Sequence, residues 1–155
     1  MDEYRTPPEL LAGVVFDLDA AATPENAVAA RYITREQDAL NPATEWPGRL
    51  IWLNPPYSHK AGPLYRWVER AWQEALKDKT VIMLLPADTS TLWFYDFLWN
   101  GHWWRPGVQG VFLRGRVRFI TPDGTRAGAP KFGSLMVRLG PTRVLPPRTN
   151  LSPPD

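Results

Sequence analysis

The tetrapeptide Asn54-Pro55-Pro56-Tyr57 directly follows an apolar segment, 49–53, and constrains the fold more than any other feature of the chain. Two consecutive prolines cannot continue a strand, because each lacks a backbone N–H and has its φ angle fixed at about −65°. A strand over 49–53 therefore ends abruptly, and an amide side chain, a rigid carbonyl and an aromatic ring follow at its carboxyl end. In open α/β sheets, ligands bind beyond the carboxyl ends of the strands. This corner is the first candidate site.

The rest of the chain alternates helix and strand patterns. Threonine-proline pairs at 6–7 and 23–24 have the form of helix starts, and apolar residues at helical spacing mark 63–77. Helices are predicted at 6–11, 23–32, 63–77 and 89–99, and strands at 14–19, 49–53, 80–85, 108–113, 116–120 and 134–138. This order predicts a three-layer α/β domain over 1–140, with a parallel sheet and an antiparallel edge.

Composition narrows the possible functions. The chain has no cysteine and only two histidines, which excludes disulfides and a thiol nucleophile and predicts no metal site. Its amino terminus lacks a signal-peptide pattern, and no apolar run reaches the ~20 residues of a membrane span, so we expect a cytoplasmic protein. Residues 141–155 contain five prolines and no apolar periodicity, which predicts a disordered tail.

The net charge is only +2, but the cations are unevenly placed. Residues 105–143 carry eight lysines and arginines against one acid, Asp123. Such a basic segment can face the phosphates of a nucleic acid, or it can be the solvated face of surface strands.

The corner at 54–57 suits the methylation of an exocyclic amine, which is a poor nucleophile because its lone pair is delocalised. The Asn54 side-chain oxygen and the Pro55 carbonyl can each accept a hydrogen bond from an NH₂ group and draw its nitrogen toward sp³ geometry. Proline suits the second position because its carbonyl is rigidly aimed and no N–H competes, and Tyr57 offers a flat face to an extruded base. Catalysis of this kind rests on positioning and polar preorganisation. The same four residues can also form a simple tight turn.

Taken together, the motifs resemble the phage-type DNA N6-adenine methyltransferases, the Dam-like family of short phage and prophage enzymes. The matching segments are 4–10, 16–22, 24–26, 31–34, 38–40, Trp46, 53–58, 84–89, 93–94, 115–119 and 129–130. The resemblance implies a reduced Rossmann-like fold, S-adenosylmethionine as cofactor, DNA as partner and a flipped adenine as target. It also implies a phage or prophage protein that acts in the cytoplasm of a bacterial host.

The resemblance further assigns roles to single residues. Thr6 and Pro7 resemble the element that contacts the methionine end of the cofactor, and Asp38 resembles an acid that accepts from the cofactor adenine, with Leu40 lining its ring. The cofactor loop after the first strand is matched by Asp17, Asp19, Ala20 and Ala21. Of its two acids we favour Asp19 as the acceptor for the cofactor ammonium. Apart from the resemblance, the sequence offers as candidates for DNA contact His59, Lys60, Arg114, Arg116, Arg118 and the loop Trp103-Trp104-Arg105.

Two departures from the wider family pattern bear on the fold. Ala20-Ala21-Ala22 stands where a Gly-x-Gly loop is usual, and only 35 residues separate Asp19 from Asn54. Two strand–helix units need about 30 residues each, so one unit is missing or reduced. Two rival functions remain: methylation of a protein glutamine by the same corner, and a non-catalytic remnant that binds nucleic acid or protein.

Overall fold

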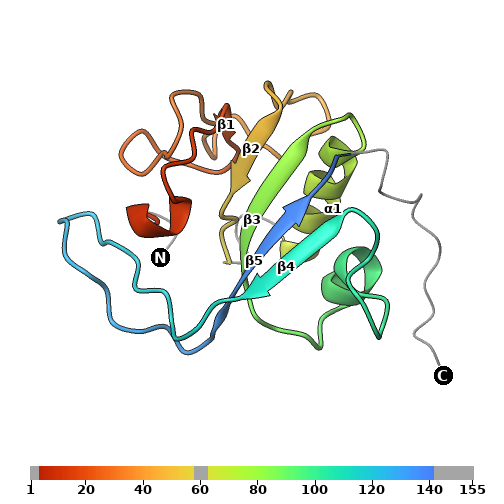
Figure 1. Cartoon of the computed structure of the whole chain (residues 1–155). Helices are drawn as coiled ribbons and strands as arrows, with labels where there is room; N and C mark the ends of the chain where they lie inside the picture. Colours follow the sequence, from red (N-terminus) through yellow and green to blue (C-terminus); the bar gives the residue numbers. More distant parts are fainter. Residues whose placement is uncertain (1–3, 58–62, 142–155) are drawn as a thin grey trace.

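The protein is built on a five-stranded mixed sheet. A computed structural model describes residues 4–57 and 63–141, with strand order β1-β2-β3-β5-β4 (Figure 1). The first three strands are parallel: β1 (Leu18–Asp19), β2 (Leu50–Leu53) and β3 (Thr80–Pro86). Antiparallel pairing adds β5 (Ser134–Leu139) and then β4 (Val108–Phe112) at the edge. The predicted mixed sheet with an antiparallel edge is confirmed.

Side chains of the central strands alternate between two buried cores, as the period of two in a strand requires. One face packs against helix α1 (Leu64–Ala75) and the π-helical turn η3 (Phe94–Leu98). Its strand residues are Ile51, Leu53, Val81, Met83, Leu85, Leu135, Val137 and Leu139. The opposite core contains Trp52 and Leu84. Strand β3 is therefore covered on both faces, as its continuous apolar sequence predicts.

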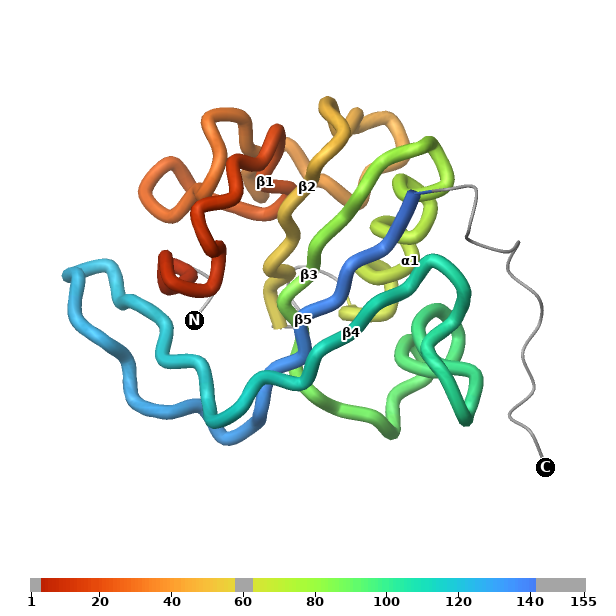
Figure 2. Tube along the Cα trace, in the orientation of Figure 1, coloured from red at the N-terminus to blue at the C-terminus, as the bar shows by residue number. Residues whose placement is uncertain are grey.

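The layer over the second face is irregular, where the three-layer prediction expected helices. It consists of N-terminal residues and of residues 113–133, the long connection between β4 and β5, which we call the arm (Figure 1). Val117 and Phe119 of the arm are buried against this face. Arg5 and Ile120 exchange two backbone hydrogen bonds, of 2.7 and 2.9 Å, so the arm lies beside the N-terminal segment (Figure 2).

Several predicted elements are shorter or absent. The predicted helix 6–11 is one 3₁₀ turn, η1 (Pro8–Leu11), and 23–32 is a series of turns in which Thr23 and Asn26 bond each other. The strand predicted at 14–19 reduces to β1. The strand predicted at 116–120 does not form, because that segment packs its apolar side chains on the sheet without joining it. No helix within the described ranges is long and apolar enough to cross a membrane.

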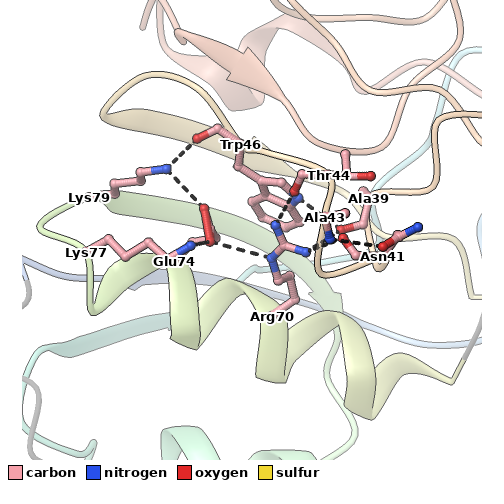
Figure 3. A network of polar contacts seen from close by, with 9 residues as sticks. All are labelled: Ala39, Asn41, Ala43, Thr44, Trp46, Arg70, Glu74, Lys77 and Lys79. Atoms are coloured by element: carbon pink, nitrogen blue, oxygen red, sulfur yellow. Dashed lines mark hydrogen bonds and ion pairs between the residues drawn. The ribbon is translucent and has the colours of Figure 1, made fainter.

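A buried arginine fastens the loop at 38–46 to α1 (Figure 3). The Arg70 guanidinium, 8% exposed, donates to the backbone carbonyls of Ala39, Asn41 and Thr44 and lies 5.0 Å from the centre of the Trp46 ring. The indole N–H of Trp46 donates to Ala39 as well, at 3.0 Å. Arginine suits this position because its planar fork carries five donors.

The charge on Arg70 is balanced by Glu74, which is 1% exposed. Arg70 Nε lies 3.5 Å from the Glu74 carboxylate, and Lys77 and Lys79 lie 2.6 and 3.0 Å from it. Lys79 also donates to the Trp46 carbonyl. Desolvation of Glu74 is more than offset by its cationic partners, which lower the pKa of its carboxyl. The four side chains thus connect α1, the start of β3 and the loop before β2.

Replacing Arg70 with methionine should destabilise the protein strongly, because the Asn41 and Thr44 carbonyls lose their Arg70 donor, the Ala39 carbonyl keeps only Trp46, and Glu74 loses one cation. We expect a loss of about 3 kcal/mol in the free energy of unfolding, measured by urea denaturation. Arg66→Met is the matched control, since Arg66 is an exposed cation on the same helix, and its effect should stay within about 0.5 kcal/mol. Equal effects for the two variants would contradict this account of the network.

Candidate functional site

A cavity of about 710 Å³ opens at the carboxyl ends of the parallel strands β1 and β2. This is the edge at which α/β sheets bind their ligands. The cavity contains most of the predicted site. The predicted residues that line it are Thr6, Ala20, Ala21, Asp38, Leu40, Asn54, Pro55, Pro56 and Tyr57. Segments far apart in sequence therefore meet at one cavity, which is lined both by the proline corner and by segments assigned to a cofactor.

The corner itself is held by two hydrogen bonds. Asn54 Nδ2 lies 3.4 Å from Thr6 Oγ1 and donates to it, and the Tyr57 hydroxyl donates to the Leu84 carbonyl at 3.2 Å. Burial of the Tyr57 hydroxyl raises its pKa well above the ordinary value, so the phenol stays neutral. The ring of Phe132 meets the Tyr57 ring edge-on at 5.5 Å between centroids. The Tyr57 ring is thus held by two contacts, while the Asn54 amide has a single long hydrogen bond to Thr6.

Asp19 lies behind the alanine loop, outside the cavity lining. It is 3% exposed, and its carboxylate oxygens accept from the backbone N–H of Val28 at 3.0 Å and of Ala21 at 3.3 Å. Burial raises the pKa of Asp19 to about 7, against the opposing effect of these two donors. Asp19 therefore shapes the loop 20–22 from beneath, and its predicted contact with a cofactor ammonium stays a prediction.

Asp17 lies one residue before β1 and is exposed, whereas Asp19 lies within β1 and is buried. Asp17 Oδ2 accepts from the backbone N–H groups of Leu50 and Arg49, both at 2.9 Å. These donors lower the pKa of the Asp17 carboxyl. Asp17 does not line the cavity but binds the segment before β1 to the start of β2.

Asp38 and Leu40 form the far wall. Asp38 adopts a left-handed backbone conformation, with φ at 54°, and its Oδ1 accepts from the Leu40 N–H at 3.1 Å. The second oxygen of an exposed carboxylate can accept from a ligand amine, while buried Leu40 offers an apolar surface beside it. The Arg70 network fixes this wall, because Ala39 lies between the two residues and accepts from Arg70.

The sequence motifs missed several lining residues. Tyr4 and Phe119 reach the cavity from the N-terminal segment and the arm, and Arg66 and Trp67 reach it from α1. The one sequence signal for Phe119 is its alternation with arginines, which predicts a strand rather than a site. The helical stripe identifies Trp67 as a core residue, and it is 6% exposed, yet it serves both the core and the cavity.

The predicted DNA contacts that the structure describes do not line the cavity. Arg114 and Arg116 are exposed on the arm, where Arg116 donates to the Pro130 carbonyl at 2.7 Å. His59 and Lys60 lie outside the described residues. In the loop 103–105, Trp104 packs against Trp99 at 5.3 Å between ring centroids, whereas Trp103 is 72% exposed. Among the described residues, no group of three or more His, Cys, Asp or Glu is arranged to hold a metal ion.

Comparison with known proteins gives one consistent result. The family model described as DNA N-6-adenine-methyltransferase (Dam) matches residues 1–149. The chain is 43% identical over 81 residues to the DNA N-6-adenine-methyltransferase of Haemophilus phage HP1 (strain HP1c1), which covers 52% of this chain and 44% of that protein. It is 37% identical over 102 residues to that of Escherichia phage T1, covering 61% and 40%. The chain thus matches less than half the length of either relative. No solved structure matches the chain.

The two acids at β1 should give opposite dependences of stability on pH. The folded pKa of Asp19, about 7, lies above its ordinary value of 3.8, so its contribution to stability is complete at low pH and is lost as the pH rises through 7. Asp19→Asn should therefore reduce the fall in the free energy of unfolding between about pH 4.5 and about pH 7.5, measured by urea denaturation.

Asp17→Asn is the matched control for this measurement. The pKa of Asp17 is lowered on folding, so its contribution is present above the ordinary value and is lost as the pH falls. Its removal should affect only the acid side of the profile. Parallel profiles for the wild type and Asp19→Asn would contradict the role given to buried Asp19.

Proposed function

Because the chain belongs to the DNA N-6-adenine-methyltransferase (Dam) family, we propose that it transfers a methyl group from S-adenosylmethionine to the N6 amine of adenine in DNA. The observation that carries the proposal is the shared cavity, which is lined both by the Asn54-Pro55-Pro56-Tyr57 corner and by segments assigned to the cofactor. The volume of about 710 Å³ is in the range of small-molecule sites. The parallel order β1-β2-β3 supports a reduced Rossmann-like methyltransferase fold.

The lining residues fit S-adenosylmethionine by their chemistry. Asp38 can accept from the adenine amine of the cofactor while Leu40 covers the ring, and Thr6 can meet the methionine end. Ala20 and Ala21 have small side chains, which allow a ligand close to the backbone where a Gly-x-Gly loop is usual. When bound, S-adenosylmethionine supplies an electrophilic methyl group.

The corner acts on the target amine. Asn54 Oδ1 and the Pro55 carbonyl accept hydrogen bonds from the two N–H groups and hold the nitrogen with its lone pair toward the methyl donor. Pro56 lacks an N–H, so it adds no competing donor at the corner. Both acceptors are in place before the reaction, which is how preorganised polar groups lower a barrier.

The target base must leave the helical stack to reach this corner, as it does in other base-modifying enzymes. Tyr57 is the stacking surface in our proposal. Its hydroxyl bond to Leu84 and its contact with Phe132 keep the ring from rotating, so the flipped adenine meets a fixed plane.

The arm is the proposed surface for the DNA backbone. It carries five cations and one acid, Asp123, whose carboxylate is occupied by the hydroxyls and N–H of its own turn. Arg114 and Arg116 are exposed, and Arg116 keeps several N–H donors beyond the one given to Pro130. Phosphate contacts of this kind position DNA without specifying its sequence.

Asn54→Ala should abolish methyl transfer but leave cofactor binding within a few-fold of the wild type, because the change removes only an acceptor for the target amine. The measurement is incorporation of tritium from labelled S-adenosylmethionine into unmethylated DNA, followed by digestion and identification of N6-methyladenine. Calorimetry with S-adenosylhomocysteine gives the binding control. Transfer that survives in Asn54→Ala would refute the role of the corner, and label found only in protein glutamine would replace the proposed substrate.

Removing the arm cations should weaken DNA binding mainly at low salt. The slope of log binding constant against log salt becomes shallower by about 0.9 for every duplex phosphate that the protein no longer neutralises. The double variant Arg114→Gln/Arg116→Gln should therefore reduce the slope by about 2, measured by fluorescence anisotropy. Arg49→Gln, which replaces an exposed arginine at the amino end of β2, should leave the slope unchanged. An unchanged slope in the double variant would place the DNA elsewhere.

A further inference from the structure

The contact between Thr6 and Asn54 joins the two halves of the cavity. Thr6, which the resemblance assigns to the cofactor, is 4% exposed and lines the cavity, 48 residues before Asn54 in the chain. Its Oγ1 accepts from Asn54 Nδ2 at 3.4 Å. With the NH₂ of the amide turned to Thr6, the amide oxygen is the group left for the target amine.

The two side chains alone do not fix this orientation. A threonine hydroxyl has one proton to donate and two lone pairs that accept, so it can bond either end of an asparagine amide. If the hydroxyl donated to Asn54 Oδ1, the NH₂ group would face the target and repel the amine that it should hold. A second acceptor for the hydroxyl proton would remove this ambiguity, because Thr6 could then only accept from Asn54.

We propose that Thr6 is a positioning residue that couples cofactor binding to the orientation of the Asn54 amide. This inference rests on the proposed function. The Thr6 hydroxyl would donate a hydrogen bond to the cofactor carboxylate, Thr6 Oγ1 would then accept from Asn54 Nδ2, and Asn54 Oδ1 would face the target amine. The Thr6 hydroxyl thereby links the bound cofactor to the Asn54 amide, which binds the target base. Neighbouring hydrogen bonds in such a chain polarise one another.

The surroundings of Thr6 suit a positioning role. The preceding residue, Arg5, is held by its two backbone bonds to Ile120, and Arg5 also donates from its side chain to the Glu25 carbonyl. Asn54 follows the buried end of β2 directly. Both partners are thus carried on segments held by other contacts, so the adjustable features are the direction of the Thr6 hydroxyl proton and the orientation of the Asn54 amide.

The first test uses the wild-type protein, and a variant serves only to assign the signals. Its readout is the pair of Asn54 side-chain NH₂ resonances in a nitrogen–proton NMR spectrum, assigned by their loss in Asn54→Ala. S-adenosylhomocysteine should shift these signals and slow their exchange with water. 5′-Methylthioadenosine, which lacks the carboxylate, should bind without either effect.

Three results would count against the inference. Equal responses to the two ligands, or binding of S-adenosylhomocysteine with no response, would overturn it while leaving the proposed function intact. No binding of S-adenosylhomocysteine by calorimetry would overturn the proposed function as well.

The second test separates positioning from packing and from simple cofactor binding. Thr6→Val keeps the shape of the side chain but removes the hydroxyl. With S-adenosylmethionine and DNA both saturating, it should lower kcat by about 10- to 100-fold, as loss of outer-shell partners does elsewhere. Thr6→Ser should restore kcat to within about 3-fold and restore the NMR response. Thr91→Val, which loses a hydroxyl outside the cavity, is the matched control. An increase in KM for the cofactor with kcat unchanged would reduce Thr6 to a binding residue and overturn the coupling.

Discussion

The guanidinium of Arg70 holds the part of the fold that regular secondary structure does not support. Between β1 and β2 the chain forms no helix, yet this segment provides the wall of the cavity that carries Asp38 and Leu40. Three backbone carbonyls of the loop at 38–46 accept hydrogen bonds from buried Arg70, and the Glu74 carboxylate balances the charge of Arg70. The Arg70 side chain thus holds the segment between β1 and β2 in place. In larger α/β domains, a second helix holds the corresponding layer through its apolar face.

The second face of the sheet is also covered without regular elements. The arm and the N-terminal segment cover it with few regular hydrogen bonds of their own, and the arm buries Val117 and Phe119 against Trp52 and Leu84. Because these segments also supply Tyr4, Thr6 and Phe119 to the cavity, the same side chains cover the core and shape the site. A substitution in this layer that weakens packing will also change the site.

The sequence predicts what depends on local pattern and misses what depends on distant partners. The strand β3 and the helix α1 are predicted correctly because each has a local sequence signal. A continuous apolar run indicates a strand that is buried on both faces, and apolar residues at helical spacing indicate a helix with one buried face. The turns at 23–32 begin like a helix because Thr23 and Asn26 satisfy the same donors in either structure. Arg70 looks like an ordinary surface charge in the sequence, since nothing local shows the three carbonyls that surround it. The corner at 54–57 is predictable because proline chemistry is local.

The pairing of Arg5 with Ile120 has a consequence for the order in which the protein assembles. Thr6 and its partner Asn54 lie in the first part of the chain, but the strand-like pairing that seats Thr6 needs a residue more than one hundred positions later. Contacts of such sequence separation form late, because the entropy of closing a long loop must be overcome first. During synthesis, the corner therefore exists on the ribosome well before the cavity does, and the site is completed only when the arm has emerged and closed over the N-terminal segment.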